Sequence, residues 1–497
     1  MFDRLIDLSV RFRWGVLVAV LAISAVGVFN VLRLPIDAVP DITNKQVQIN
    51  TVASSLSPTE METRVTFPIE TALAGIPGLE STRSISRNGF SQVTAVFTEQ
   101  TDVYFARQQV SERLVQAGES LPAGIEPSMG PVSTGLGEVL MWTVAYEHPE
   151  GKGAKIVDGQ PGWQSDGSFL TAERERLDTP IARASYLRTV QDWIVRPQLR
   201  SVQGVAGVDS IGGYEKQFVV EPDPTRMASF GVSWSELAHA LEAANQSVGA
   251  NFVERGGEAF LVRANALIQN LDQIRTASVA TREGVSILVR DLAEVRIGGD
   301  LRTGAASENG EEVVVGTVLM LVKENSRTVS SAAAARLTEV AKSLPAGVKV
   351  QIVYDRSNLV NATIETVERN LAEGAVLVAA ALFLILGNWR AALIATLLIP
   401  LSMLMTAIGM NQLAVSGNLM SLGALDFGLI IDGAVIVIEN CLRRLSERQH
   451  HEGRLLTLDE RMSEVIAATR EMVKPTIYGQ IIILLVFAPL LTFTGVE

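Results

Sequence analysis

The chain has 497 residues, which is too long for a single domain, and only 19% of them are Asp, Glu, Lys or Arg. Its mean hydropathy of +0.25 is high for a soluble protein, so the sequence predicts a membrane protein. A formal net charge of −12 excludes nucleic-acid binding, which requires a basic surface. The single cysteine, Cys441, excludes an intrachain disulfide, and the four histidines show no Cys/His metal-motif spacing.

The first predicted element is a transmembrane helix within residues 1–34. Residues 14–32 are almost wholly apolar, and they follow a segment that carries Arg4, Arg11 and Arg13. A basic flank of this kind stays on the cytoplasmic side, so we expect an uncleaved anchor with a cytoplasmic N-terminus. A cleaved signal peptide is the alternative, but the apolar run is long for one and no small-x-small cleavage site follows it.

A large soluble region is expected from residue 35 to residue 369, because no stretch within it is apolar enough to span a membrane. Its first module, residues 35–135, contains a capping box at Ser57 and Glu60 and a hairpin-type turn at Asn88-Gly89. The pattern predicts the order β-α-β-β-α-β, which is the ferredoxin-like split βαβ arrangement. The first five elements are expected at residues 46–53, 57–74, 79–86, 92–98 and 102–119.

The phrase Ser-Leu-Pro-Ala-Gly occurs at residues 120–124 and again at 343–347, each time between a predicted helix and a predicted strand. This recurrence predicts a second copy of the α/β module. We assign the second module to residues 136–200 and 285–369, with a further α/β subdomain inserted at 201–284. Residues 147–178 are rich in Gly, Pro, Asp and Ser, and they are expected to form a long exposed loop.

Four further apolar stretches bring the predicted number of transmembrane helices to five. They are expected at residues 370–387, 391–413, 419–440 and 476–494, with a loop containing an amphipathic helix at 441–475. Basic residues gather at the N-terminus, at Arg390 and in the 441–475 loop, which places these segments in the cytoplasm and residues 35–369 in the periplasm. The predicted fold class is therefore an α-helical membrane domain plus an α+β periplasmic domain.

The predicted span at residues 419–440 carries three acids, Asp426, Asp432 and Glu439. A carboxylate near the middle of a bilayer costs at least about 2.5–3.5 kcal/mol, so such acids point to a function. At about 100° and 1.5 Å per residue, Asp432 and Glu439 share one helix face and the three acids extend over about 20 Å. Such a ladder of titratable groups is typical of a path for protons.

Two structural explanations of these acids compete with the proton path. Buried acids can be paired with a basic side chain on another helix, although three acids on one helix make this harder to arrange. Glu439 lies close to Arg443 and Arg444 in the sequence and is the weakest member, because it can be an ordinary charge at the membrane surface.

Several motifs together resemble the resistance-nodulation-division (RND) exporters, and most closely their heavy-metal branch of cation-proton antiporters. They are NLMSLGAL followed by DFGLIIDGAVIVIEN at residues 426–440, GNWRAALIATLLIP at 387–400, ENSRTVS at 324–330, YDRS at 354–357 and KPTIYGQ at 474–480. The likeness covers essentially the whole chain. Members of this family have twelve spans in two halves, so the sequence is similar to the N-terminal half alone.

The resemblance implies roles for individual residues. Asp426, Asp432 and Glu439 match the family's proton-relay acids, while Glu138 and Asp192 match carboxylates of a periplasmic metal cleft. An ordinary surface or helix-capping role is the alternative for the latter pair. The soluble modules correspond to two pore modules, with a docking module at 201–284.

The fourth helix also bears on the metal that the resemblance implies. Met420 matches one methionine of the copper and silver exporters, but Ile430 and Val437 replace others, so divalent zinc, cobalt, cadmium or nickel is favoured.

The predicted function is a proton-driven exporter of divalent heavy-metal cations in a bacterial inner membrane, a transporter and not an enzyme, with the metal as substrate and no cofactor. The resemblance implies a homotrimer that works with a periplasmic adaptor, an outer-membrane channel and the missing C-terminal half. Three alternatives remain: a multidrug exporter, which favours a Phe-rich pocket; an intramembrane aspartyl protease, which needs facing aspartates; and a membrane-anchored binding protein that transports nothing.

Overall fold

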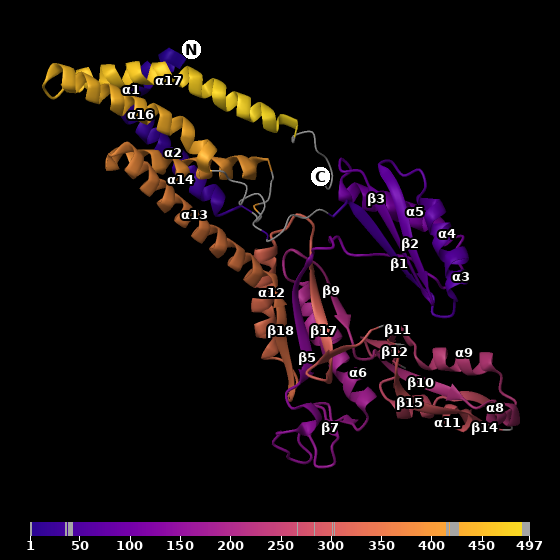
Figure 1. The fold of residues 1–497 in the computed structure, drawn as a ribbon. Coiled ribbons are helices and arrows are strands. Elements are labelled where there is room, and N and C mark those ends of the chain that lie inside the picture. Colours follow the sequence, from indigo (N-terminus) through magenta and orange to yellow (C-terminus); the bar gives the residue numbers. More distant parts are fainter. Residues whose placement is uncertain are drawn as a thin grey trace.

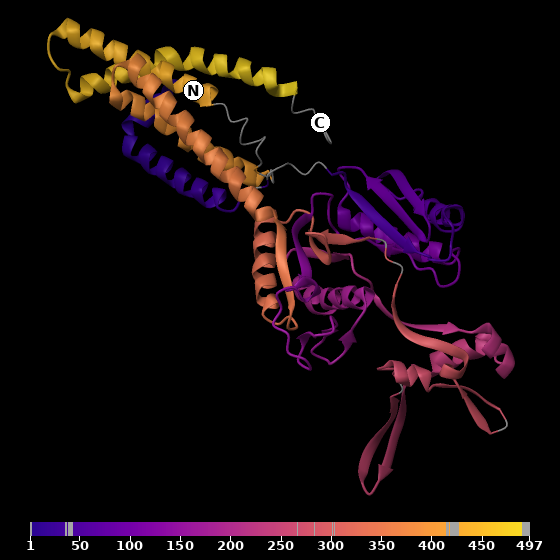
Figure 2. The same cartoon turned by 60° about the horizontal axis from the view of Figure 1, so that its bottom comes forward.

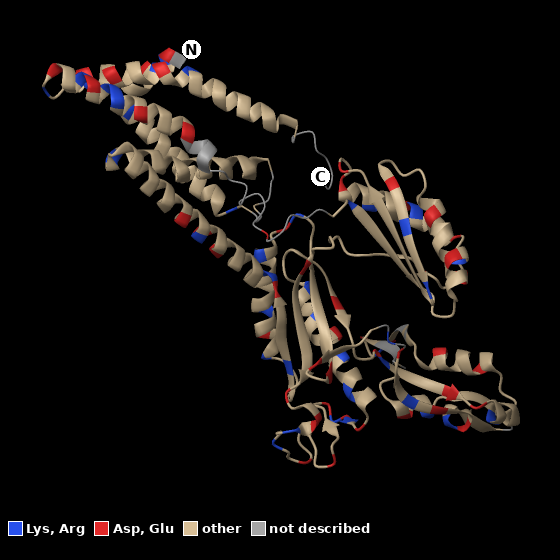
Figure 3. Cartoon of the chain, viewed as in Figure 1, with Lys and Arg blue, Asp and Glu red and all other residues tan. Residues whose placement is uncertain are grey.

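The computed structural model describes residues 2–34, 37, 43–265, 267–282, 284–300, 302, 304–413, 417 and 427–489. An elongated bundle of helices forms one end of the molecule, and α/β units form the other end (Figure 1). Charged residues are sparse on helices α2 (Arg13–Val31) and α14 (Trp389–Gln412) and on the C-terminal half of α17 (Leu458–Phe487), and they are frequent on the α/β units (Figure 3). The separation into a membrane part and a soluble part therefore follows the apolar stretches of the sequence.

The first α/β module is a four-stranded antiparallel sheet in the order β2-β3-β1-β4. The Ser57 and Glu60 capping box opens its first helix, and a two-residue turn at Asn88-Gly89 joins β2 to β3, both as predicted. Apolar residues of β1, β3 and the helices form its core. The elements are β1 Gln46–Val52, α3 Pro58–Met61, α4 Phe67–Leu73, β2 Leu79–Arg87, β3 Phe90–Phe97, α5 Val103–Gly118 and β4 Ser128–Met129.

The four long strands of the second α/β module lie in the order β9-β17-β5-β18. Counted along the chain, these are its second, third, first and fourth long strands, which is the same order as in the first module. Both Ser-Leu-Pro-Ala-Gly phrases follow a helix, and their glycines, Gly124 and Gly347, have φ of +82° and +80°. The five-residue recurrence thus marks a repeated fold. The elements are β5 Glu138–Tyr146, α6 Pro180–Val190, α7 Arg196–Arg200, β9 Val205–Ile211, β16 Ala306–Glu308, β17 Glu311–Met320, α12 Ser326–Ala341 and β18 Val348–Asp355.

The first helix of each module contains one widened turn just before a proline. These turns are η1 Glu62–Thr66, before Pro68, and η3 Gln191–Val195, before Pro197. In each, the next backbone N–H donates to the carbonyl five residues back, from Phe67 to Glu62 and from Arg196 to Gln191. Because proline has no N–H and its ring clashes with the carbonyl four residues earlier, the wider turn accommodates it within a continuing helix.

Two corrections concern the soluble region. Strand β9 belongs to the second module's sheet, while β14 and β15 belong to the insertion, so the inserted unit spans 212–305 and not 201–284. Residues 147–178 are not simply an exposed loop. They contain the small sheet β6-β7-β8, Gly162–Trp163, Phe169–Leu170 and Arg176–Leu177, whose Trp163 and Phe169 are buried against Tyr146. The segment folds despite its polar composition because burial of its aromatic side chains stabilises it.

The inserted unit has its own apolar core around β10, β15 and four short helices. Two hairpins, β11 with β12 and β13 with β14, project from it (Figure 2). The elements are β10 Lys216–Pro222, α8 Pro224–Phe230, α9 Trp234–Ala244, β11 Ser247–Arg255, β12 Glu258–Asn265, α10 Leu271–Arg275, β13 Ser278–Arg282, β14 Val285–Leu288, α11 Val289–Leu292 and β15 Ala293–Gly299.

Of the described helices, α2, α13 and α14 are long and apolar enough to cross a membrane. Helix α13 is continuous over 31 residues, so the second predicted span is the C-terminal part of a helix that begins directly after strand β18 of the second module. Asn388 caps α14 by accepting from the N–H groups of Arg390 and Ala391. The helices are α1 Phe2–Arg11, α2 Arg13–Val31, α13 Arg356–Leu386, α14 Trp389–Gln412, α16 Phe427–Glu452 and α17 Leu458–Phe487.

A third correction concerns the length of the predicted cytoplasmic loop at 441–475. Helices α16 and α17 continue into it from both sides, which leaves residues 453–457 between them, and α17 passes through Pro475 without a break. A capping box at Thr457 and Glu460 opens α17. Ion pairs between α16 and α17 support these helix extensions. Residues 419–426 and 490–494 of the predicted spans lie outside the described residues.

Candidate functional site

Helix α16 places Asp432 and Glu439 on one exposed face, with Ile436 between them. The spacing of four and then three residues aligns all three side chains along the helix. Neither carboxylate forms a hydrogen bond or an ion pair with another described residue. Asp426, the third predicted acid, lies outside the described residues. The acid face of α16, defined here as Asp432, Ile436 and Glu439, is therefore open among the described residues.

The other faces of α16 are packed. Val435 and Ile438 contact the apolar cluster formed by Leu382, Ala392, Ala395 and Ile399 of α13 and α14. Asn440 is buried and donates to the Ala468 carbonyl of α17 at 3.0 Å and to the Glu471 carboxylate at 3.2 Å. Packing against α14 and α17 thus fixes the rotation of α16 and turns the acids outward.

Gly433, next to Asp432, lets α17 approach α16 closely. A Cβ atom at Gly433 would lie 2.5 Å from Nε2 of Gln480 and 3.1 Å from Cγ2 of Thr476. Both neighbours belong to the KPTIYGQ motif, and Oγ1 of Thr476 is buried without a hydrogen-bond partner among the described residues. A small residue on α16 therefore lets two polar side chains of α17 lie close to the α16 backbone at Gly433.

A cluster of ion pairs holds the far end of α16 to α17. Arg444 donates to Glu464 at 2.8 Å and to Glu471 at 3.1 Å, and Arg448 donates to Glu464 at 2.7 Å. The hydrogen bond from Arg448 lowers the pKa of the Glu464 carboxyl, against the opposing effect of burial. None of the ion pairs described here joins Glu439 to Arg443 or Arg444, so pairing with these arginines does not explain Glu439.

The structure places Glu138 and Asp192 apart in the second module. Glu138 is exposed at the start of β5 and pairs with Leu319 of β17. Asp192 is hydrogen-bonded to Ser210 of β9. Ser210 pairs with Gly316, three residues from Leu319 on β17, so the two carboxylates belong to different places on the sheet. The Asp192 carboxylate is 2.6 Å from the Ser210 hydroxyl and 2.5 Å from Nε of Arg188, and Nη1 of Arg196 lies 3.7 Å away. Its oxygens are thus already engaged.

No group of three or more His, Cys, Asp or Glu side chains that could hold a metal ion occurs within the described ranges of the chain. A typical zinc site has four ligands, so Glu138 and Asp192 together would supply only part of one. The described residues of this chain thus contain separate carboxylates that can contribute to a site, but they contain no complete site.

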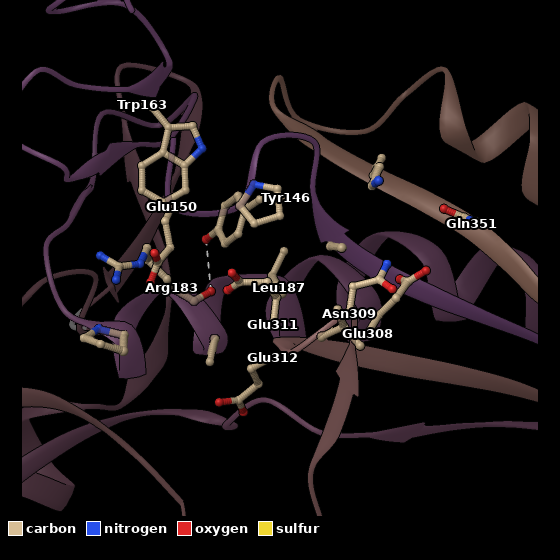
Figure 4. A pocket seen from close by; sticks show the side chains of 16 residues that line it. Tyr146, Glu150, Trp163, Arg183, Leu187, Glu308, Asn309, Glu311, Glu312 and Gln351 are labelled. Atoms are coloured by element: carbon tan, nitrogen blue, oxygen red, sulfur yellow. Dashed lines mark hydrogen bonds between the residues drawn. The ribbon is translucent and has the colours of Figure 1, made fainter. Parts of the chain in front are cut away.

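A cavity of about 290 Å³ lies between the end of β5, the small sheet and the β16-β17 turn. Figure 4 shows Glu150, Glu308, Glu311 and Glu312 around it, together with Tyr146, whose hydroxyl donates to the Arg183 carbonyl at 3.0 Å. Sequence reasoning missed this cavity because its walls come from distant segments. The only signal of this cavity in the sequence is the close spacing of Glu308, Glu311 and Glu312.

An apolar helical bundle with an open row of acids, joined to two copies of one α/β module, is the architecture of a membrane transporter. Residues 5–497 match the model of the AcrB/AcrD/AcrF family. The chain belongs to this family, which confirms the resemblance to the RND exporters.

Relatives that match the whole chain include heavy-metal resistance proteins. The chain is 63% identical to the nickel-cobalt-cadmium resistance protein NccA of Alcaligenes xylosoxydans xylosoxydans over all of this chain and 46% of that protein. It is 51% identical to the cobalt-zinc-cadmium resistance protein CzcA of Cupriavidus metallidurans over all of this chain and 44% of that protein.

A crystal structure of a heavy metal efflux pump matches 99% of this chain and 45% of that chain, with 32% identity and a TM-score of 0.82. The chain thus spans about half the length of the relatives it matches, as predicted for an N-terminal half.

Proposed function

We propose that this chain is the N-terminal half of a proton-driven exporter of divalent heavy-metal cations in a bacterial inner membrane. The observation that carries the proposal is the acid face of α16, open while the helix's other faces are packed. The names of the relatives supply the substrate class, and the higher identity to NccA favours nickel, cobalt and cadmium, with zinc also in the set.

The open acid face indicates how protons are moved. A carboxylate without a partner in an apolar medium favours its protonated form, so a group that binds and releases protons needs a counter-charge or polar partner that comes and goes. Asp432 and Glu439 have no such partner among the described residues. We assign the relay to Asp426, Asp432 and Glu439, and the partner to a helix of the second half that packs against this face.

For the metal, we assign Glu138 and Asp192 to a cleft completed by the second half. Glu138 is the more available ligand, because it is exposed and lies at the end of a strand. Asp192 has to release Arg188 or Ser210 before it can bind a cation. Both hydrogen bonds are local to the second module, so a small shift of the η3 turn changes the availability of this carboxylate.

The proposal includes an arrangement in the membrane. The strand orders β2-β3-β1-β4 and β9-β17-β5-β18 support two ferredoxin-like pore modules. The arginines of α16 and α17 beyond the predicted spans support a cytoplasmic location for residues 441–475; they are Arg443, Arg444, Arg448, Arg461 and Arg470. We therefore propose five spans, a cytoplasmic N-terminus and a periplasmic region whose inserted unit is a docking module. By analogy with the family, the whole pump is a trimer that engages a periplasmic adaptor and an outer-membrane channel.

The test is Asp432→Asn in a pump that contains residues 1–497 and the matching second half. Asparagine keeps the shape and the hydrogen-bonding capacity but does not titrate, so metal export and metal tolerance are expected to be lost while insertion is retained. Glu447→Gln is the control, because Glu447 is an exposed acid of the same helix, paired with Arg443 beyond the predicted span. Metal tolerance that survives Asp432→Asn would refute the relay, and export by residues 1–497 alone would refute the need for a second half.

A further inference from the structure

Arg356, the first residue of α13, is buried although it carries a full charge, with 5% of its surface exposed. Its Nε and Nη2 atoms donate to the same oxygen of Asp37 at 3.0 and 2.9 Å, and Nη1 donates to the Leu136 carbonyl at 3.3 Å. Burial of an arginine is costly unless each part of the guanidinium is bonded, which is the case here. The arginine thus joins three segments that are far apart in the sequence.

Asp37 extends this junction towards the acidic helix. Its backbone N–H donates to the carbonyl of Gly417 at 2.9 Å, and Gly417 lies in the connection between α14 and α16. Asp37 itself lies between α2 and the first module. One residue therefore contacts the segment that leads into the acidic helix through its backbone and Arg356 through its side chain.

On the other side, the start of α13 is fixed to the second module. One oxygen of Asp355 accepts from the backbone N–H of Ser357 at 2.8 Å and lies 2.6 and 2.7 Å from the hydroxyls of Ser357 and Ser330. Ser330 is wholly buried on α12, and its hydroxyl also lies 2.8 Å from the Val139 carbonyl of β5. The beginning of α13 and the beginning of β5 are thus held together.

We propose that Arg356 is a positioning residue that couples the connection between α14 and the acidic helix α16 to strand β5, an inference that rests on the proposed function. The sequence of contacts runs from the α14-α16 connection at Gly417, through Asp37 and Arg356, to Leu136. Leu136 lies two residues before Glu138, the more available of the proposed metal ligands. A movement of Gly417 that accompanies protonation of the acidic helix is in this way transmitted to the strand that carries a metal ligand.

The chemistry of the junction requires arginine. A guanidinium group presents its donors in a planar fork, so it holds a carboxylate on one edge and a carbonyl on another at once. A lysine ammonium keeps the charge but is a single point, and it cannot occupy both positions. Arg356→Lys therefore removes the mechanical connection while it leaves a cation beside Asp37, and Asp37→Asn removes the ion pair while it leaves the backbone bond to Gly417.

The experiment uses pumps that contain residues 1–497 and the matching second half, reconstituted in vesicles. Metal export and proton uptake are measured together in the unmodified pump, in Arg356→Lys and in Asp37→Asn. Arg369→Lys is the matched control, because Arg369 lies on the same helix in a pair with Glu365 whose side chains are 65% and 72% exposed.

Both junction variants are expected to lower the number of metal ions exported per proton by about tenfold, the size of a typical coupling between sites. Arg369→Lys is expected to leave this ratio unchanged. An unchanged ratio in Arg356→Lys overturns the inference, as does an equal fall of both fluxes with the amount of folded pump, which is the sign of a merely structural role. If Asp37→Asn does not assemble, Arg356→Lys decides.

Failure of the proposed function gives a different result. In that case the unmodified pump itself shows no exchange of metal for protons, or Asp432→Asn exchanges as well as the unmodified pump does. Exchange that is intact in the unmodified pump, lost in Asp432→Asn and unaffected in Arg356→Lys removes the coupling role of Arg356 and leaves the proposed function standing.

Discussion

The two α/β modules share one topology but differ at the widened turn of their first helix. In the first module the leading residues of the turn, Glu62 and Thr63, are exposed. In the second module the same two positions hold Gln191, which is buried and accepts from Nε1 of Trp142 at 3.0 Å, and Asp192, which bonds Arg188 and Ser210. A widened turn before a proline is thus used twice, and at its first two positions only the second copy holds a buried polar side chain, Gln191.

The space around Trp142 shows how closely the second module is fitted to this turn. A Cβ atom at Gly316 would lie 2.3 Å from the Trp142 ring and 2.6 Å from Nε2 of Gln191. Glycine at this position of β17 therefore allows the ring and the amide to meet. The repeated topology sets where the turn lies, while the surrounding side chains decide whether its leading residues are exposed or buried.

The largest expected difference between the modules is at the first position of the turn. Gln191→Ala leaves the buried indole N–H of Trp142 without its acceptor and opens a cavity, so it should lower the free energy of unfolding by about 2 kcal/mol. Glu62→Ala, at the matching exposed position, should change it by less than about 0.5 kcal/mol. Thermal unfolding followed by tryptophan fluorescence measures both. Equal effects would show that the two turns are energetically alike.

The second position distinguishes structure from metal binding. Asp192→Asn keeps a partner for Ser210 but loses the charge beside Arg188, which should lower the free energy of unfolding by about 1 kcal/mol. Glu138→Gln, at an exposed strand end, should leave stability unchanged and lower metal export. Export assays and unfolding on the same preparations separate the two effects. Normal export in Glu138→Gln would remove this residue from the metal cleft.

The smallest expected effect compares the capping boxes of the first module and of α17. Glu60 is held by Ser57, whereas Glu460 also accepts from Arg454 at 2.9 and 2.7 Å, which lowers its pKa to about 2. A lowered carboxyl pKa stabilises the fold above the unfolded value near 4.5, and this stabilisation is lost as the pH falls from there towards 2.

Glu460→Gln should therefore flatten the dependence of the unfolding temperature on pH between 4.5 and 2, and Glu60→Gln should do so less. A steeper acid dependence in Glu460→Gln would contradict this sign.

Local signals in the sequence predicted local structure well. The capping box at Ser57 and the Asn88-Gly89 turn both formed, because each depends on side chains within three residues of the backbone group that they bond. The repeated Ser-Leu-Pro-Ala-Gly phrase correctly indicated a repeated module. The predicted boundaries of the insertion were wrong, since the partner of β9 is chosen by sheet pairing and not by its own residues.

The sequence by itself determined that this protein has an acidic row on an apolar helix, because the cost of burying a carboxylate and the period of a helix are both read from residue types and spacing. Only the tertiary structure decided which way that row faces, because the rotation of α16 is set by the packing of Val435, Ile438 and Asn440 against other helices. The same holds for Arg356 and Asp37. They lie 319 positions apart in the chain, and no local pattern connects residues that only the folded chain brings together.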